Sequence, residues 1–192
     1  MPLTLPNLLT WLRIAAIPLF VGVFYLSPIA VTQSEKNAIA TSIFVAAAIT
    51  DWLDGWLART MNQTSAFGAF LDPVADKLMV AAALVLLVQL GRADAVVALV
   101  IIGREIAISA LREWMAKVGA ARSVAVSYVG KIKTTAQMIA VPLLLFDGFL
   151  AGISMRATGT LLLWVAAVLT LWSMIYYLRK ALPYAFREPP SA

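Results

Sequence analysis

Long apolar stretches separated by short polar segments dominate the chain. Each stretch is close to the roughly 20 residues that a helix needs to cross a bilayer. Irregular backbone cannot face lipid, and the stretches are too long for barrel strands, so we expect helices. The predicted spans are residues 8–28, 38–58, 69–90, 95–115, 126–146 and 158–178. The pattern therefore predicts an all-α integral membrane protein in which residues 1–192 form a single domain, a bundle of six transmembrane helices.

The composition supports this class of protein and narrows its chemistry. Of the 192 residues, 62% are hydrophobic and only 13% are charged, whereas a soluble domain is roughly half apolar. The chain has neither cysteine nor histidine. This excludes disulfides, a thiolate nucleophile and sulfur or imidazole metal ligands, and it removes the commonest general base. Carboxylates, lysine, arginine and hydroxyl groups must carry any chemistry.

The net charge of +5 does not indicate a nucleic-acid partner, because the basic residues are dispersed through the short segments between apolar stretches. With a cytoplasmic N-terminus, twelve of the 15 lysines and arginines lie inside, as the positive-inside rule requires. Lys36, Arg92 and Arg156 are the three outside. Both termini are thus predicted in the cytoplasm. Arg13 lies within the first apolar stretch rather than ahead of it, which favours a retained anchor over a cleaved signal peptide.

Four carboxylates between residues 51 and 76 stand out, because acidic side chains beside membrane spans are costly. Asp51 and Asp54 are three residues apart, and Asp72 and Asp76 are four apart, so each pair shares one face of its helix. If the faces meet, they form a site for one or two hard cations such as Mg²⁺ or Mn²⁺. Two such ions suit displacement at phosphorus. The residues alone predict a metal-dependent enzyme acting on a phosphate-bearing lipid.

The neighbours of these carboxylates permit two interpretations. Gly55 leaves room for a ligand beside the acidic pair, and Arg59 brings a positive charge to its edge. Asn7, Thr10 and Arg13 recur every three residues and form one polar strip on the first helix. That strip is either an interfacial cap with an arginine reaching the surface or one wall of a binding site.

Two later stretches place charges at membrane depth. Arg104, Glu105 and Arg112 lie in the fourth span, and a polar cluster with Lys131 and Lys133 opens the fifth. Arginine suits an anionic head group, but a structural Arg–Glu pair is an alternative for the first group. The lysines either bind substrate or serve as topology signals whose charges reach the surface.

A pattern within residues 51–76 is similar in every fixed position to the signature of the CDP-alcohol phosphatidyltransferase family. The pattern is Asp51-x2-Asp54-Gly55-x2-Ala58-Arg59-x8-Gly68-x3-Asp72-x3-Asp76. The resemblance implies six transmembrane helices, a homodimer and a site facing the cytoplasm. It also implies that an alcohol attacks the diphosphate of CDP-diacylglycerol and releases CMP.

The resemblance assigns roles to residues of this chain. The metal ligands would be Asp51, Asp54, Asp72 and Asp76, with Asp76, assisted by Asp72, as the catalytic base. The residues expected to contact CDP-diacylglycerol are Asn7, Thr10, Arg13, Gly55, Arg59 and Ser65. The polar strip of the first helix is then a wall of the nucleotide site.

Three further segments, within residues 7–13, 104–113 and 130–137, resemble the branch of the family that makes phosphatidylglycerophosphate in bacteria. This branch implies the bacterial inner membrane and sn-glycerol 3-phosphate as acceptor. The acceptor's phosphate needs cationic partners, for which the candidates are Arg104, Arg112, Lys131 and Lys133.

Other functions remain open on the sequence alone. Within the family, serine, inositol phosphate or phosphatidylglycerol could be the acceptor, and only the basic residues favour a phosphorylated one. Intramembrane prenyltransferases also hold Mg²⁺ with aspartates, but their spacing differs. A divalent-cation transporter would place its carboxylates at mid-membrane, whereas these cluster toward one end of their spans.

Overall fold

The structure, a computed structural model, describes residues 5–60, 66–120 and 128–185. Within these ranges it describes the backbone but not the side chains of residues 5–7, 54–60, 66, 67, 69, 128, 129, 131 and 185. The fold is all-α apart from one short hairpin, as predicted.

Six helices follow one another in the described part of the chain, close to the predicted positions. They are α1 Leu5–Gly22, α2 Gln33–Thr60, α3 Ala66–Gln89, α4 Ala95–Lys117, α5 Tyr128–Phe146 and α6 Met155–Ala185. The 3₁₀ turn η1, Val23–Tyr25, continues α1. Strands β1 (Phe149–Leu150) and β2 (Ile153–Ser154) form an antiparallel hairpin between α5 and α6.

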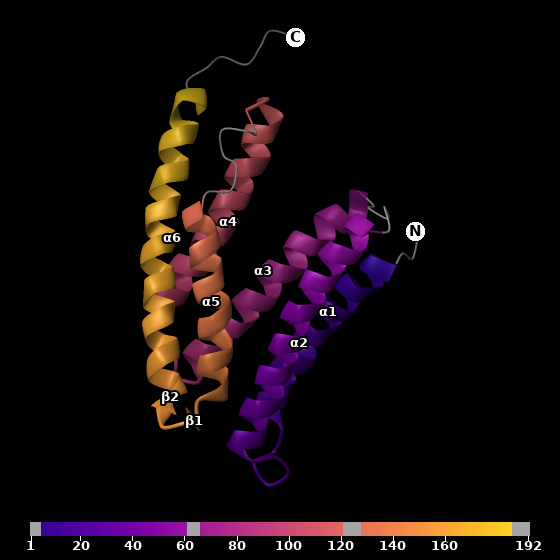
Figure 1. Ribbon diagram of the computed structural model, residues 1–192, viewed down its shortest axis with the longest axis vertical. Coiled ribbons are helices and arrows are strands. Elements are labelled where there is room, and N and C mark those ends of the chain that lie inside the picture. Colours follow the sequence, from indigo (N-terminus) through magenta and orange to yellow (C-terminus); the bar gives the residue numbers. More distant parts are fainter. Residues whose placement is uncertain (1–4, 61–65, 121–127, 186–192) are drawn as a thin grey trace.

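The helices form two groups joined through α3. Figure 1 shows α4, α5 and α6 on one side of the molecule and α1 and α2 on the other, with α3 crossing between them. Helix α5 packs along α6 and also contacts α2. The β1–β2 hairpin lies at the lower end in this view, whereas α1 begins and α6 ends toward the upper end. We call these the hairpin end and the carboxylate end.

The main core lies where the two groups meet, and a smaller one lies between α4 and α6. Phe20, Phe44 and Leu84 are buried in the first, and Met115 and Tyr177 in the second. Such burial of large apolar side chains is the main favourable contribution to folding.

Helices α5 and α6 approach each other closely at Gly159. A Cβ atom there would lie 2.8 Å from Cγ of Leu144 and 3.1 Å from the carbonyl oxygen of Ala140. A side chain at this crossing would force Leu144 to shift and would crowd the Ala140 carbonyl, so a glycine favours the close approach of the two helices.

Two helix starts differ from the predicted positions. Helix α2 begins at Gln33, inside a predicted loop, because Thr32 and Glu35 form a capping box: the Thr32 amide donates to Glu35 Oε2 at 2.8 Å, and the Glu35 amide to Thr32 Oγ1 at 3.3 Å. Helix α3 begins at Ala66, so Pro73 and Asp72 lie within the helix rather than at its start. Packing on neighbouring helices outweighs the cost of the proline.

Among the described residues, two segments are long and apolar enough to cross a bilayer by length and composition, Leu8–Tyr25 and Met155–Tyr184. The apolar segment Ile132–Phe146 is shorter. Helices α3 and α4 are also long, but they carry charged residues that lower their hydropathy, including Asp76 and Arg104.

Candidate active site

Arg13 of α1 joins the carboxylates of two other helices. Its side chain is almost fully buried, and Nη1 donates to Asp51 Oδ1 of α2 at 2.6 Å and to Asp76 Oδ1 of α3 at 2.8 Å. One turn earlier, Thr10 Oγ1 donates to Asp72 Oδ1 at 2.5 Å. The faces that carry the predicted acidic pairs therefore meet, and α1 lies against them.

The burial of Thr10 and Arg13 argues against the interpretation of this strip as an interfacial cap. Thr10 is 0% exposed and Arg13 is 3% exposed, whereas a capping arginine that reaches the surface would leave its guanidinium in water. Arg13 instead lies within the carboxylate cluster. We name the group of Thr10, Arg13, Asp51, Asp72 and Asp76 the carboxylate cluster.

The carboxylate cluster borders a cavity of about 320 Å³. The side chains of Asp51 and Asp76 are 41% and 49% exposed, so both carboxylates remain accessible despite their contact with Arg13. The other polar residues of the cavity wall are Lys77, Glu105, Thr134 and Gln137. Its apolar lining is Phe44, Ala47, Ala48, Pro73, Met79, Val80 and Met138.

Next to the same cavity, α4 and α5 contribute a group of paired charges, of which Glu105 belongs to the lining. Glu105 accepts a hydrogen bond from Lys133 Nζ and another from Arg104 Nη1 at 3.3 Å. Arg104 and Lys133 are both buried. The structure thus brings together two predicted acceptor-binding residues, and it contains the Arg–Glu pair that was the alternative interpretation. We name Arg104, Glu105 and Lys133 the cationic cluster.

Arg112 lies apart from this cavity. It is absent from the cavity lining, and its Nη2 donates to Tyr177 Oη of α6 at 3.5 Å. The 320 Å³ cavity therefore does not bring Arg112 into contact with the carboxylate cluster.

Lys77, one of the twelve lysines and arginines predicted to lie on the inside, was missed as a residue of the site. Its Nζ donates to Ser109 Oγ, and the Ser109 hydroxyl donates to the Glu105 carbonyl at 2.7 Å. The signal was present, because Lys77 directly follows Asp76 within a long apolar helix. A lysine in that position needs a partner inside the protein.

Several predicted site residues cannot be placed in this geometry. The side chains of Asn7, Asp54, Gly55, Arg59 and Lys131 lie outside the described residues, although their backbones belong to helices. Ser65 lies outside the described residues altogether. Their roles stay predictions.

The donor set suits a hard cation. Asp51 and Asp76 each have a carboxylate oxygen within 2.8 Å of the same Arg13 nitrogen, so the two carboxylates lie close enough together to share one cation, as they share the Arg13 guanidinium. Mg²⁺ takes oxygen ligands at about 2.0–2.1 Å and keeps several waters. No group of three or more possible ligands occurs among the residues described, which do not include the Asp54 side chain. The residues present fit an ion held by a few carboxylates.

An apolar groove adjoins the cavity between α2 and α5. Its lining is Phe44, Val45, Ala48, Ile49, Trp52, Met138 and Pro142, with a volume of about 280 Å³. It shares Phe44, Ala48 and Met138 with the cavity. Trp52 is mostly exposed. The groove therefore leads from the neighbourhood of the carboxylate cluster to the outer surface of the bundle.

A family model and individual relatives both match this chain, and they agree on its family. The family model described as CDP-alcohol phosphatidyltransferase matches residues 3–172. Proteins named "CDP-diacylglycerol--glycerol-3-phosphate 3-phosphatidyltransferase" from Escherichia coli (strain K12), Shigella flexneri serotype 5b (strain 8401) and Shigella sonnei (strain Ss046) are each 52% identical over 183 residues. These alignments cover 94% of this chain and 96% of each relative.

Proposed function

The chain belongs to the CDP-alcohol phosphatidyltransferase family, and on that premise we propose that it transfers the phosphatidyl group of CDP-diacylglycerol to sn-glycerol 3-phosphate. The observation that carries this proposal is the cavity that Arg13, Asp51 and Asp76 line together with Glu105, the carboxylate that pairs with the buried Arg104 and Lys133. The aspartates suit a cation-bound diphosphate, and the cations paired with Glu105 suit a phosphorylated acceptor. The relatives at 52% identity are named for the same reaction.

The reaction is a displacement at phosphorus. The free hydroxyl of glycerol 3-phosphate, at the end away from its phosphate, attacks the phosphorus that bears the diacylglycerol group. A new P–O bond forms, the bond to the CMP oxygen breaks, and the hydroxyl proton goes to a base. The products are phosphatidylglycerophosphate and CMP.

Asp76 is our candidate for that base. Its carboxylate lines the cavity and is 49% exposed, so an acceptor hydroxyl can reach it. A positioned carboxylate can accept the proton as the P–O bond forms. Arg13, bound to Asp76 and Asp51, fixes the direction in which these carboxylates point. Thr10 does the same for Asp72.

A divalent cation completes the site in this proposal. Asp51, Asp72 and Asp76, together with Asp54, would hold one or two Mg²⁺ or Mn²⁺ ions. When bound, such ions neutralise the diphosphate oxygens and stabilise the leaving group. The oxygen-only donor set and the shared contact of Asp51 and Asp76 with one Arg13 nitrogen support this assignment.

The rest of the nucleotide site is assigned by the family pattern. Asn7, Gly55, Arg59 and Ser65 would contact the CDP moiety, together with Thr10 and Arg13 of the carboxylate cluster, of which Arg13 lines the cavity. Within that cluster, Arg13 contributes a fixed positive charge for the diphosphate.

The cationic cluster would select the acceptor. Arg104 and Lys133 bring two positive charges against the single carboxylate of Glu105, which leaves a net positive site beside the cavity. A phosphate dianion is attracted to such a site, whereas serine brings no comparable charge. Lys131 and Arg112 are further candidates for this role.

The groove between α2 and α5 would take the acyl chains. It is apolar, joins the cavity and reaches the outer surface. We infer that the six helices cross the bacterial inner membrane with the termini and the carboxylate end in the cytoplasm, and that the protein works as a homodimer. The dispersed inside charges support the orientation.

A substrate panel tests the proposal. The purified protein is incubated with CDP-diacylglycerol, Mg²⁺ and one acceptor at a time, and CMP release is measured. We expect release with sn-glycerol 3-phosphate and little with serine, inositol phosphate or phosphatidylglycerol. Omitting Mg²⁺ or adding a chelator should stop the reaction. Preferential use of another acceptor would overturn the glycerol phosphate assignment, and metal-independent CMP release would overturn the role of the carboxylates.

A further inference from the structure

A buried tyrosine of α6 lies against two arginines of α4. Tyr177 is fully buried. The Cζ atom of Arg104 lies 5.7 Å from the centre of its ring, and that of Arg112 lies 5.4 Å from it. Both distances fall within the range of a cation–π interaction, which is strongest away from water. Arg112 also donates to the Tyr177 hydroxyl at 3.5 Å.

The same face of α6 holds Arg104 at a second point. Arg104 Nη2 donates to Ser173 Oγ at 3.0 Å, and the Ser173 hydroxyl donates to the carbonyl of Thr170 at 3.0 Å. Ser173 and Tyr177 are four residues apart and therefore lie on one face of α6. We name this pair the α6 face.

The guanidinium groups of Arg104 and Arg112 have contacts on α6, but not all of their N–H groups have a hydrogen-bond acceptor. The Nε atoms of Arg104 and Arg112 are buried and have no hydrogen-bond partner in the part of the chain that the structure describes. Arg104 forms an ion pair with Glu105, which it shares with Lys133. No described carboxylate pairs with Arg112. Buried donors without partners are costly, so an incoming anion with several oxygens would find them available.

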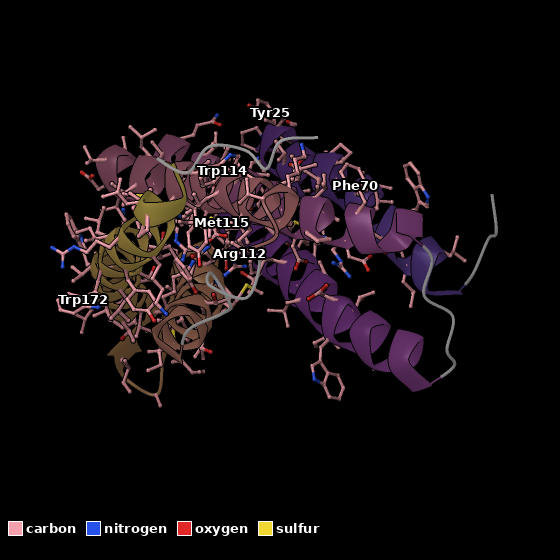
Figure 2. The ribbon with its side chains drawn as sticks, turned by 90° about the horizontal axis from the view of Figure 1, so that it is seen from above. Tyr25, Phe70, Arg112, Trp114, Met115 and Trp172 are labelled. Carbon is pink, nitrogen blue, oxygen red and sulfur yellow. The ribbon has the colours of Figure 1, made fainter. Side chains whose placement is uncertain are left out.

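Arg104 is linked to the 320 Å³ cavity through Glu105, the carboxylate that accepts its hydrogen bond and that lines the cavity. Figure 2 shows Arg112 toward the middle of the molecule, whereas Trp172 of α6 stands at its edge. From α6, a helix that contributes no described residue to the cavity lining, Tyr177 therefore contacts Arg104, which pairs with a lining residue, and Arg112, which lies apart from the lining.

We propose that Ser173 and Tyr177 are positioning residues, which hold the guanidinium groups of Arg104 and Arg112 in place for the phosphate of the acceptor. This inference rests on the proposed function. The aromatic ring tolerates two cations next to it without neutralising them, so the positive charge stays available for the ligand. A carboxylate in the same place would hold the arginines but would also compete with the phosphate.

The test compares Tyr177→Leu, Tyr177→Phe and Ser173→Ala with the wild-type protein. KM for sn-glycerol 3-phosphate, KM for CDP-diacylglycerol and kcat are measured for each. We expect Tyr177→Leu to raise the acceptor KM by about 10-fold, since a desolvated cation–π contact is lost from each arginine. Tyr177→Phe keeps the ring face and should restore most of the affinity. Ser173→Ala should raise the acceptor KM about threefold, for one lost hydrogen bond. KM for CDP-diacylglycerol should stay within about twofold.

The neighbouring tyrosine supplies a matched control. Tyr176 is partly exposed, and Lys180 Nζ lies 4.7 Å from the centre of its ring. Tyr176→Leu removes the same side-chain volume from the same helix, including an edge-on contact with the Tyr177 ring at 5.7 Å between ring centres, but it keeps the Tyr177 ring beside the two arginines. We expect its acceptor KM to equal that of the wild type.

A second readout separates positioning from a purely structural role. Unphosphorylated glycerol at high concentration is offered in place of glycerol 3-phosphate, and the ratio of the two kcat/KM values is compared between variants. Tyr177→Leu should lower this ratio, because only the phosphate depends on the arginines. A variant that merely folds less well loses kcat with both substrates and keeps the ratio.

The outcomes are distinct. If the wild type does not use glycerol 3-phosphate, the proposed function fails. If the wild type does use it and Tyr177→Leu changes kcat alone, the inference fails while the function stands. Should Tyr177→Leu not yield folded protein, Ser173→Ala decides, and an unchanged acceptor KM in that variant overturns the inference.

Discussion

Each end of the bundle buries an arginine, but the side-chain partners of the two arginines differ in their exposure. At the carboxylate end, Arg13 binds two side-chain carboxylates that border a cavity. At the hairpin end, Arg92 donates to the main-chain carbonyls of Leu144 and Leu145 at 3.3 and 2.8 Å, and to Asn37 Oδ1 at 2.9 Å. The first set of partners can be shared with a ligand, and the second is fixed by the fold.

The hairpin end shows how a membrane-type bundle satisfies buried cations without a binding site. Lys36 Nζ donates to the carbonyl oxygens of Leu26 at 2.5 Å and Phe24 at 3.4 Å, at the C-terminal end of η1. Arg92 Nε pairs with Asp147 at 3.1 Å. Burial lowers the pKa of the Arg92 guanidinium, and the nearby Asp147 opposes that shift. These cations close helix ends, where carbonyl groups lack partners within the helix.

Burial of a charged side chain therefore does not by itself indicate a functional site. What distinguishes the carboxylate end is that both carboxylate partners of Arg13 are half-exposed and line a cavity. If the distinction holds, substitutions at the carboxylate end should lower kcat, and substitutions at the hairpin end should lower the free energy of unfolding.

The largest effect is expected for Asp76→Asn. Removal of the proposed base should lower kcat by about 1,000-fold, within the range that general base catalysis contributes. Binding of CDP-diacylglycerol should be largely retained, because the other carboxylates can still hold at least one ion. Steady-state CMP release and equilibrium binding of CDP-diacylglycerol measure the two quantities.

Asp147→Asn is the matched control for that change, since it alters an aspartate at the hairpin end. Its kcat should equal that of the wild type. Turnover near the wild-type level in Asp76→Asn would remove Asp76 from the base role.

The next largest effect is on stability, at the opposite end. Arg92→Met removes a donor from two carbonyls and from Asn37 and an ion-pair partner from Asp147, and should lower the free energy of unfolding by about 3 kcal/mol. Thermal unfolding in detergent measures this loss, and kcat per folded molecule should not change. Arg156→Met is the control: Arg156 also lies near Asp147 but is half-exposed, so its loss should cost much less.

Addition of Mg²⁺ tests whether the two ends of the bundle contribute to stability independently. Mg²⁺ should raise the unfolding temperature of the wild type and of Arg92→Met by the same amount, because an ion that binds the folded state stabilises it by mass action. An Mg²⁺ response that disappears in Arg92→Met would mean that the two ends are not independent.

The smallest effect concerns the start of α2, also at the hairpin end. The amide and hydroxyl of Thr32 donate to Glu35 and hold the pKa of its carboxyl below the usual 4.5. A lowered pKa contributes stability that is fully present above pH 4.5 and is lost as the pH falls through the lowered value. The gap in unfolding temperature between wild type and Glu35→Gln should therefore be small near neutral pH and close on acidification. A gap that persists at low pH would contradict this account.

The sequence predicted the features that follow from spacing along a helix. Thr10 and Arg13, and Asp72 and Asp76, were placed on shared faces because residues three or four apart are neighbours on a helix, and the structure brings these faces together. The six helices followed from the lengths of the apolar stretches, and their positions agree closely.

The features that escaped prediction depend on main-chain partners or on contacts between distant helices. Lys36 and Arg92 were counted as outside charges, but both are buried, because carbonyl oxygens accept their hydrogen bonds and any residue type supplies a carbonyl. The contact of Arg112 with Tyr177 joins residues 65 apart. No spacing rule reaches that far.

The groove between α2 and α5 gives the proposed enzyme two separate entrances. The lipid substrate would arrive sideways from the bilayer through the apolar groove, and the acceptor would arrive from water on the cationic side. The rate would then depend on the mole fraction of CDP-diacylglycerol in the surrounding lipid and on the molar concentration of the acceptor in water. Diluting CDP-diacylglycerol with inert lipid should slow the reaction even when its amount per volume is constant.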